Sequence, residues 1–279
     1  MRIFPVTFFG MSLRHLCPIA VFCCLVSVCA TAEPVPVRHV AGTLHGFLAV
    51  HAVDGQVIAE GDLTQTVHGD RVTLHVVFRF KDGSLDDETT VYTQHKVFQL
   101  ISDRHIQRGP YFPRPMDTAI DARSGLVTVR ATGKDGKEQV ETEHMKLPAD
   151  LANGLTFVVG QNVLPDGPST TVSMVAATPK PRLVKLVYTP RDEDPFSIAG
   201  FGRKATRIEM KVDLGGVAGV VAPLVGKQPG DFNMWVVEGE APVLIKETGY
   251  LYQDGPPLTF SFASPAWPQS PDEKIVGAK

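Results

Sequence analysis

Hydrophobic and polar side chains alternate with a period of two along several segments of the chain. In residues 206–214, Ile, Met, Val and Leu side chains share one face while charged side chains share the other. Residues 72–80 and 258–262 repeat this alternation with Val, Leu and Phe. Successive side chains of a β-strand point to opposite faces, so the pattern predicts antiparallel strands with one buried and one solvated face.

Turn signals separate these segments. Five Asp-Gly pairs occur, and most of them lie between alternating or β-branched stretches. Asp-Gly suits the positive φ angles of a type I′ turn, so the pairs predict tight hairpin connections. They begin at Asp54, Asp82, Asp135, Asp166 and Asp254.

Helical patterns are scarce, and the best candidate is Pro148–Asn153, with Gly154 in the place of a left-handed cap. We therefore predict a mainly β protein with little helix. A single domain over residues 33–268 would be built on a large, curved antiparallel sheet, either a half-barrel or barrel-like. Two β subdomains divided at residues 178–182 are the alternative. Residues 269–279 are polar and are predicted to be a disordered tail.

The N-terminal residues have the pattern of an export signal. Residues 16–28 are apolar, follow Arg14, and precede a small-residue motif ending at Ala32 that suits a signal peptidase. The apolar stretch is shorter than the roughly 20 residues that span a bilayer. We therefore predict a signal peptide over residues 1–32, cleaved after Ala32, and no transmembrane anchor after cleavage. Both Met1 and Met11 fit as the translation start.

The positions of the cysteines give further information on the location of the mature chain. All of them fall within the predicted signal peptide: Cys17, Cys23, Cys24 and Cys29. A mature chain without thiols excludes disulfides, Cys-ligated metals and cysteine catalysis. Such a chain is typical of a bacterial envelope protein, so we expect a periplasmic or secreted location. The chain has 27 Lys and Arg, two of them before Ala32, against 30 Asp and Glu, which argues against nucleic-acid partners.

Residues 102–121 concentrate charged and aromatic side chains around three prolines. His105 is a candidate general base oriented by a nearby acid, and Arg104 or Arg108 is a candidate for holding an anionic group. The alternative is a rigid loop whose charges pair locally and face water. With Tyr111 and the more distant Trp235, these residues form the predicted ligand-binding set.

Motifs for cofactors and metals are absent from the sequence, so we predict neither. His39, His45 and His51 are evenly spaced, but neighbours six residues apart on one strand lie about 20 Å from each other, and we expect them on a solvated face. The acidic runs 86–88 and 192–194 are predicted to be solvated turns.

Residues 214–225 contain Gly, Val, Ala, Leu and Pro without charge, and are too short to span a bilayer. They predict either a buried strand or a pliable apolar lip over a cavity for a lipid-like ligand. Trp235, just downstream, would pack against that cavity or fill the core.

Two stretches resemble known proteins: KVDLGGVAGVVAPLVGKQPGDFNMWVVEG at Lys211–Gly239, and FKDGSLDDETTVYTQH with RHIQRGPYFPRPM within Phe80–Met116. Here the chain is similar to a family of uncharacterised secreted bacterial proteins. The resemblance implies an exported domain of unknown function and assigns no catalytic residue. At the level of fold, an exported curved sheet is also similar to periplasmic lipoprotein carriers, which hold an apolar cavity in a half-barrel.

The sequence favours an exported protein that binds an apolar small molecule or lipid inside its curved sheet, without catalysis. One alternative is a hydrolase-type enzyme that uses His105 and nearby acids. Another is a structural or interaction protein of the envelope that joins partners through exposed strand edges. The oligomeric state stays open.

Overall fold

The computed structural model describes residues 33–133, 136–177, 180–215 and 230–264. These belong to a unit over Ala32–Lys279, and a second unit over Met1–Thr31 lies outside the described residues. The predicted signal peptide, the predicted tail and most of the apolar stretch 214–225 also lie outside them. None of the helical segments in the described part of the chain is long and apolar enough to cross a membrane.

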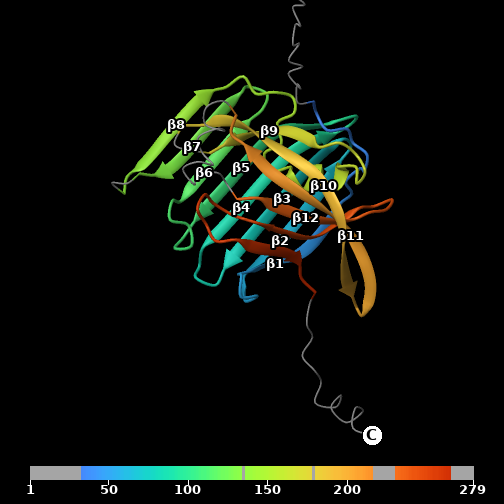
Figure 1. Ribbon diagram of the computed structural model, residues 1–279. Helices are drawn as coiled ribbons and strands as arrows, with labels where there is room; N and C mark the ends of the chain where they lie inside the picture. The colour runs from blue at the N-terminus through green and yellow to red at the C-terminus, as the bar shows by residue number, and fades with distance from the viewer. Residues whose placement is uncertain (1–32, 134–135, 178–179, 216–229, 265–279) are drawn as a thin grey trace, which may run out of the picture. The chain divides into compact units, whose positions relative to one another are not determined.

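The described residues form fourteen strands and one helix (Figure 1). Before the helix come β1 (Leu44–His51), β2 (Val57–His68), β3 (Arg71–Phe80), β4 (Leu85–Gln94), β5 (Phe98–Arg108), β6 (Met116–Asp121), β7 (Leu126–Thr132) and β8 (Glu138–His144). The helix α1 covers Thr156–Asn162. After it come β9 (Thr170–Ala176), β10 (Arg182–Ile198), β11 (Phe201–Asp213), β12 (Phe232–Val237), β13 (Val243–Gly249) and β14 (Leu258–Phe262).

All fourteen strands join one antiparallel sheet, which confirms the predicted fold class. The chain runs outward from β1 to β8 at one edge, re-enters at the other edge with β9, and returns to β14 beside β1. In the described residues β8 and β9 end the strand order without pairing to each other, so the sheet curls on itself but stays open. β9 and β10, which lie on either side of the predicted division, pair with each other in this same sheet.

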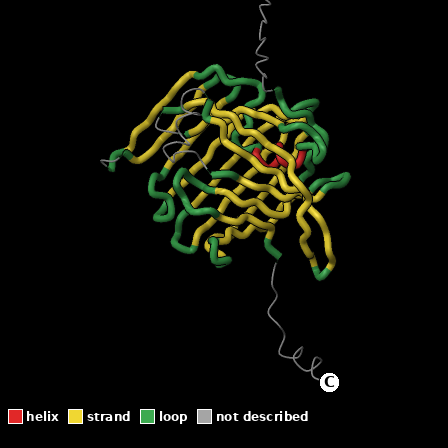
Figure 2. Tube along the Cα trace, in the orientation of Figure 1, coloured by secondary structure: helices red, strands yellow, loops and turns green. Residues whose placement is uncertain are grey.

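The sheet curls around the helix α1 (Figure 2), and the hydrophobic core lies on this concave face. Alternation along β3 illustrates its origin, because the five hydrophobic residues predicted to share a face are all buried: Val72, Leu74, Val76, Phe78 and Phe80. The helix α1 packs against β12 and β13 from inside the curl, with Val159 only 1% exposed. It has seven residues and no side-chain cap, so burial rather than intrinsic propensity stabilises it.

The predicted helix at Pro148–Asn153 is wrong. Leu151 instead forms an isolated parallel bridge with Ser173 of β9. The neighbouring carboxylate of Asp150 accepts hydrogen bonds from the Ser173 hydroxyl at 2.9 Å and from Lys185 Nζ at 3.3 Å. The Leu151 N–H also donates to the Pro148 carbonyl at 3.2 Å, so the segment forms turns beside β9, and the left-handed Gly154 (φ +66°) precedes a helix instead of ending one.

The predicted Asp-Gly connections lie where expected at two well-described hairpins, but their turn type differs. Gly55 between β1 and β2 and Gly83 between β3 and β4 have φ angles of +83° and +84°, whereas Asp54 and Asp82 do not adopt positive φ. Each Asp carboxylate instead accepts the backbone N–H two residues later, at 3.0 and 2.9 Å. Each connection therefore has an Asx turn with one left-handed residue, the glycine, whereas a type I′ turn has two residues with positive φ.

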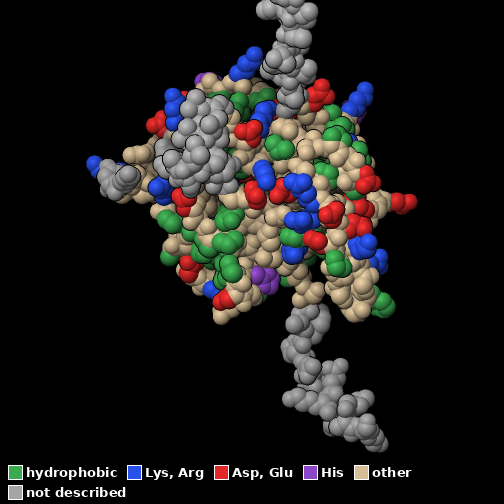
Figure 3. All heavy atoms as spheres, in the orientation of Figure 1, with side chains coloured by type: hydrophobic (Ala, Val, Ile, Leu, Met, Phe, Trp, Pro, Cys, Tyr) green, Lys and Arg blue, Asp and Glu red, His purple; other side chains and the backbone are tan. Residues whose placement is uncertain are grey.

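The convex side of β10 and β11 presents both signs of charge, which Figure 3 shows intermingled on this face. Lys204 pairs with Glu193 at 3.0 Å, and Arg207 lies 3.6 Å from Asp194. Residues 192–194 were expected in a solvated turn; they are largely solvent-exposed but lie within the strand β10. The balanced ion pairs of these strands leave no extended patch of one sign in this view.

Candidate functional site

Polar side chains replace hydrophobic ones on the concave face of β4 and β5. The antiparallel register places Asp86 opposite Gln107, Glu88 opposite His105 and Thr90 opposite Asp103. On β3 the same rows continue with the core residues Phe78, Val76 and Leu74. We call this group the interior polar cluster: Asp86, Glu88, Thr90, Asp103, His105 and Gln107.

Hydrogen bonds connect most of the interior polar cluster. The His105 Nε2 lies 3.1 Å from Asp86 Oδ1 and 3.2 Å from Oδ2, while its Nδ1 lies 4.0 Å from Glu88 Oε1. Gln107 Nε2 donates to Asp86 Oδ2 at 2.8 Å, and Thr90 Oγ1 donates to Asp103 Oδ1 at 2.8 Å. The imidazole therefore lies between two carboxyl groups inside the sheet.

The prediction of a solvated turn at residues 86–88 is wrong. These residues lie in β4, where Asp86 and Glu88 face the interior and Asp87 faces the opposite side. Asp87 pairs there with His75 Nε2 at 3.0 Å. The sequence signal was present as a second alternation, because Asp86, Glu88, Thr90, Tyr92 and Gln94 recur every two residues. Because most side chains on this buried face are polar, a search for alternating hydrophobic residues does not detect the strand.

Opposing effects act on the pKa of His105. Burial lowers it, but the carboxyl groups of Asp86, Glu88 and Asp103 together outweigh burial and raise the pKa to about 10. The imidazole is therefore protonated at neutral pH. A protonated ring donates from both nitrogens, which matches acidic groups on both of its sides.

Two acids of the interior polar cluster, Asp103 and Glu88, have pKa values raised above those of solvated carboxyls. Burial raises the pKa of Asp103 to about 8, and the nearby Glu88 carboxyl adds to this shift. Burial likewise raises the pKa of Glu88 itself. Burial and a neighbouring acid disfavour the ionised form of Asp103, so Asp103 is mainly protonated at neutral pH.

The cluster also borders open interior space. The His105 and Glu88 side chains keep 28% and 29% of their surface accessible, although both lie on the concave face, while the Asp86 side chain keeps 6%. Nearby on the same face, the hydroxyl of Thr118 is buried and has no hydrogen-bond partner among the described residues. A buried polar atom without a partner is costly, so such atoms point to water or a ligand.

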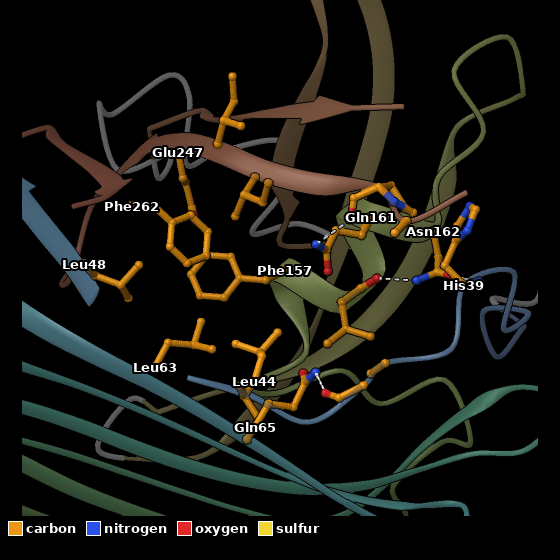
Figure 4. Close-up of a pocket in the computed structure, with 18 of the residues that line it drawn as sticks. His39, Leu44, Leu48, Leu63, Gln65, Phe157, Gln161, Asn162, Glu247 and Phe262 are labelled. Carbon is orange, nitrogen blue, oxygen red and sulfur yellow. Dashed lines mark hydrogen bonds between the residues drawn. The ribbon is translucent and has the colours of Figure 1, made fainter. Parts of the chain in front are cut away.

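A separate cavity of about 260 Å³ lies between α1 and the strands β1, β2, β13 and β14. Figure 4 shows its hydrophobic wall, where Phe157 of α1 comes close to the side chains contributed by the sheet. The hydrophobic lining includes Leu44, Leu48, Leu63, Phe78, Phe157, Phe260 and Phe262. Concave, mainly apolar sites with few polar groups are typical of small-molecule binding.

Glu247 of β13 connects the cavity with the interior polar cluster. Its side chain lines the cavity (Figure 4) and is only 7% exposed, in a row between Met234 and Phe260. Burial raises the pKa of Glu247 to about 8, with a further contribution from the Glu88 carboxyl. Its Oε2 has no hydrogen-bond partner within the described part of the chain.

The structure separates the residues of the predicted ligand-binding set. His105 alone joins the interior polar cluster. Arg104 lies on the other face of β5 and pairs with Asp117, with nitrogen to oxygen distances of 2.9 and 3.2 Å. Arg108 is an exposed residue at the end of β5. The predicted rigid loop is thus confined to residues 109–115, because β5 and β6 take up the rest of 102–121.

Tyr111 and Trp235 belong neither to the interior polar cluster nor to the lining of the cavity beside α1. Tyr111 stacks on Phe80 with ring centroids 4.4 Å apart. Trp235 faces away from Met234: Lys246 Nζ lies 3.6 Å from its ring centroid, and its Nε1 donates to Asp194 at 2.8 Å. The roles of Tyr111 and Trp235 in ligand binding stay predictions.

Sequence reasoning missed Glu247, Asp103, Glu88 and the cavity wall. In the sequence Glu247 appears as one charged residue among others near β13, and nothing marks it as buried. Its position becomes apparent only through its pairing with Phe260 and Met234.

Across the described residues, no three His, Cys, Asp or Glu side chains are arranged to hold a metal ion.

Comparisons with known proteins concern the fold. No protein-family model matches the chain, and no curated protein matches its sequence. The chain is similar to a solved structure described as a beta-barrel-like protein of domain of unknown function DUF1849 from Brucella abortus. The match covers 82% of this chain and 98% of that chain, at 8% sequence identity and a TM-score of 0.42. It assigns no activity or ligand to this chain.

Proposed function

We propose that this protein binds an apolar or lipid-like small molecule in the cavity beside α1, without catalysis. The observation that carries the proposal is the cavity of about 260 Å³ with its wall of Leu and Phe side chains. Apolar surface that faces an unfilled space gains neither packing contacts nor full burial, so an apolar ligand that fills the space is stabilised there. The volume is slightly below the roughly 300–1,000 Å³ of ordinary ligand sites, which favours a small occupant.

The hydrolase alternative is less well supported. A general base must accept a proton near the working pH. The pKa of His105, about 10, keeps the imidazole protonated at neutral pH, so it does not accept a proton from an attacking water.

The alternative of an envelope protein that joins partners through strand edges is also less well supported. The edge strand β8 is almost entirely exposed and carries Glu138, Glu141 and Glu143. Charged side chains on an edge strand oppose pairing with another sheet. The predicted signal peptide over residues 1–32 supports the further proposal that binding takes place in the periplasm or outside the cell.

The binding proposal is tested by titrating the protein with the uncharged fluorescent probe N-phenyl-1-naphthylamine. The Leu63→Trp variant fills the cavity with a larger side chain, and we expect it to weaken probe binding at least about ten-fold, which corresponds to the loss of one well-packed apolar contact. Leu63 is suited to this test because it lines the cavity from β2.

Leu183→Trp is the matched control. Leu183 lies on β10, is 39% exposed and does not line the cavity beside α1. This variant is expected to bind the probe as the unmodified protein does. Equal probe binding by all three proteins, or no binding by the folded unmodified protein, would overturn the proposal.

A further inference from the structure

Three polar side chains line the cavity while being buried: Gln65, Asn162 and Glu247. Two of them already have protein partners. Gln65 Nε2 donates to the Gly42 carbonyl at 2.6 Å, and Asn162 Nδ2 donates to the Val158 carbonyl at 2.8 Å. Glu247 differs from both, because its Oε2 has no hydrogen-bond partner among the described residues. The cavity therefore has one buried polar group with unused bonding capacity.

The electrostatic surroundings of Glu247 are acidic. The charged group that acts on it is the Glu88 carboxyl, which adds to the effect of burial in raising its pKa to about 8. Lys246 also borders the cavity, but its Nζ lies 3.6 Å from the centroid of the Trp235 ring, on the other face of β13 from Glu247. The ionised form of Glu247 is thus disfavoured by burial and by the Glu88 carboxyl, and a cation bound beside it would offset both effects, so Glu247 releases its proton to solvent when the cation binds.

A second group near Glu247 is also unsatisfied. The hydroxyl of Tyr188 on β10 is buried without a hydrogen-bond partner in the described residues. Burial raises the pKa of Tyr188, and the Glu247 carboxyl contributes to that shift. Tyr188 does not line the cavity, so Glu247 is the member of this pair that a ligand there contacts, and its ionised carboxylate suits a ligand that donates.

We propose that the occupant of the cavity is an amphiphile with a cationic amine head, which pairs with the Glu247 carboxylate while its apolar tail contacts the Leu and Phe wall. This inference rests on the proposed function, since it assumes that the cavity binds a ligand. An anionic head, such as that of a fatty acid, would add a third carboxylate beside Glu247 and Glu88 and is rejected. A neutral alcohol gains the contacts of the tail but no ion pair.

The test measures the affinities of octylamine, 1-octanol and octanoate by isothermal titration calorimetry on the same protein. These probes share the length of their tails and differ in the charge of the head. We expect octylamine to bind about ten-fold or more tightly than 1-octanol, because a hydrogen bond to a charged group is stronger than one between neutral groups. Octanoate is expected to bind most weakly.

Glu247→Gln removes the charge at nearly constant volume and is expected to abolish the preference for octylamine over 1-octanol while leaving 1-octanol binding unchanged. Glu60→Gln is the matched control, because Glu60 is an exposed residue of β2. It is expected to retain the full preference, which excludes a general effect of net charge.

The outcomes separate the two proposals. Binding of 1-octanol without preference for octylamine, or a preference that survives in Glu247→Gln, overturns the amine head but leaves the apolar site in place. Tightest binding by octanoate also overturns the amine head. Binding of none of the three probes to the folded protein overturns both the amine head and the proposed function.

Discussion

Asp103 and Glu247 are acids placed where a β protein ordinarily keeps hydrophobic side chains. Asp103 is 3% exposed and Glu247 is 7% exposed, and the pKa of each is raised to about 8, mainly by burial. At neutral pH both are therefore mainly protonated, and neither carries the full cost of a buried charge. The protonated His105, which lies between Asp86 and Glu88, then supplies the positive charge of the interior polar cluster.

This arrangement predicts that stability decreases as the pH rises. Asp103 and Glu247 hold protons in the folded state that the unfolded chain has released above ordinary values of 3.8 and 4.5, so raising the pH towards about 8 favours unfolding. His105 acts in the same direction from its ordinary value of 6.5 up to about 10. Thermal unfolding followed by circular dichroism should therefore show a melting temperature that falls between about pH 6.5 and pH 8.

A double variant with Asp103→Asn and Glu247→Gln tests the origin of this pH dependence. Without the two titrating acids, the melting temperature should fall less steeply over the same range, while Glu60→Gln should keep the slope of the unmodified protein. A double variant that keeps the full slope would show that other groups control it.

At the scale of residues, the sequence predicted the hydrophobic half of the core and missed the polar half. The alternation that placed Val72, Val76 and Phe80 on one buried face is confirmed. The same period is present from Asp86 to Gln94, but a polar stripe does not indicate which face is buried. Only the pairing of β4 with β3, which places Glu88 opposite Val76, assigns that stripe to the interior.

The helix α1 determines how the curled sheet is filled. Four of its seven residues are buried, and Phe157, Val158, Gln161 and Asn162 form one wall of the cavity. Since it lacks a side-chain cap and is too short to be stable alone, its packing against β12 and β13 must hold it in place. Loss of that packing would affect both stability and the cavity.

Val159→Ala tests this dependence. Val159 is 1% exposed, so truncation leaves a cavity behind, and we expect a loss of about 1–3 kcal/mol in the free energy of unfolding measured by urea titration. Val140→Ala on the edge strand β8, where Val140 is 54% exposed, should change it by less than about 0.5 kcal/mol. Equal losses in the two variants would contradict the role assigned to α1.

At the scale of elements, strands were predictable and the helix was not. Local alternation and Asp-Gly turns are sufficient to place β3, β11 and β14, because each signal lies within a few residues. The helix forms at Thr156–Asn162 through contacts with distant strands. Its neighbour at Pro148–Asn153 has the better local signals but forms turns that Ser173 and Lys185 hold in place through Asp150, which the local sequence does not reveal.

At the scale of the whole molecule, one strand pairing near the two ends of the described chain joins the sheet together. β1 and β14 are adjacent in the sheet, with Leu48 opposite Phe262 and Val50 opposite Phe260. This pairing joins the strands β1–β8 to the strands β9–β14 and brings residues of both groups to the cavity wall. The sequence predicted a curved sheet, but no local pattern indicated the pairing of β1 with β14. The position of the cavity beside α1 was therefore not predictable.

The binding of an apolar molecule inside the curled sheet is tested most directly by crystallography with 1-bromooctane. The bromine scatters anomalously, so its position is found without assumptions about the protein. We predict an anomalous peak in the cavity bounded by Leu63, Phe157 and Phe262. Well-ordered crystals soaked with 1-bromooctane that show no peak in this cavity, or peaks only on the convex face, would contradict the account.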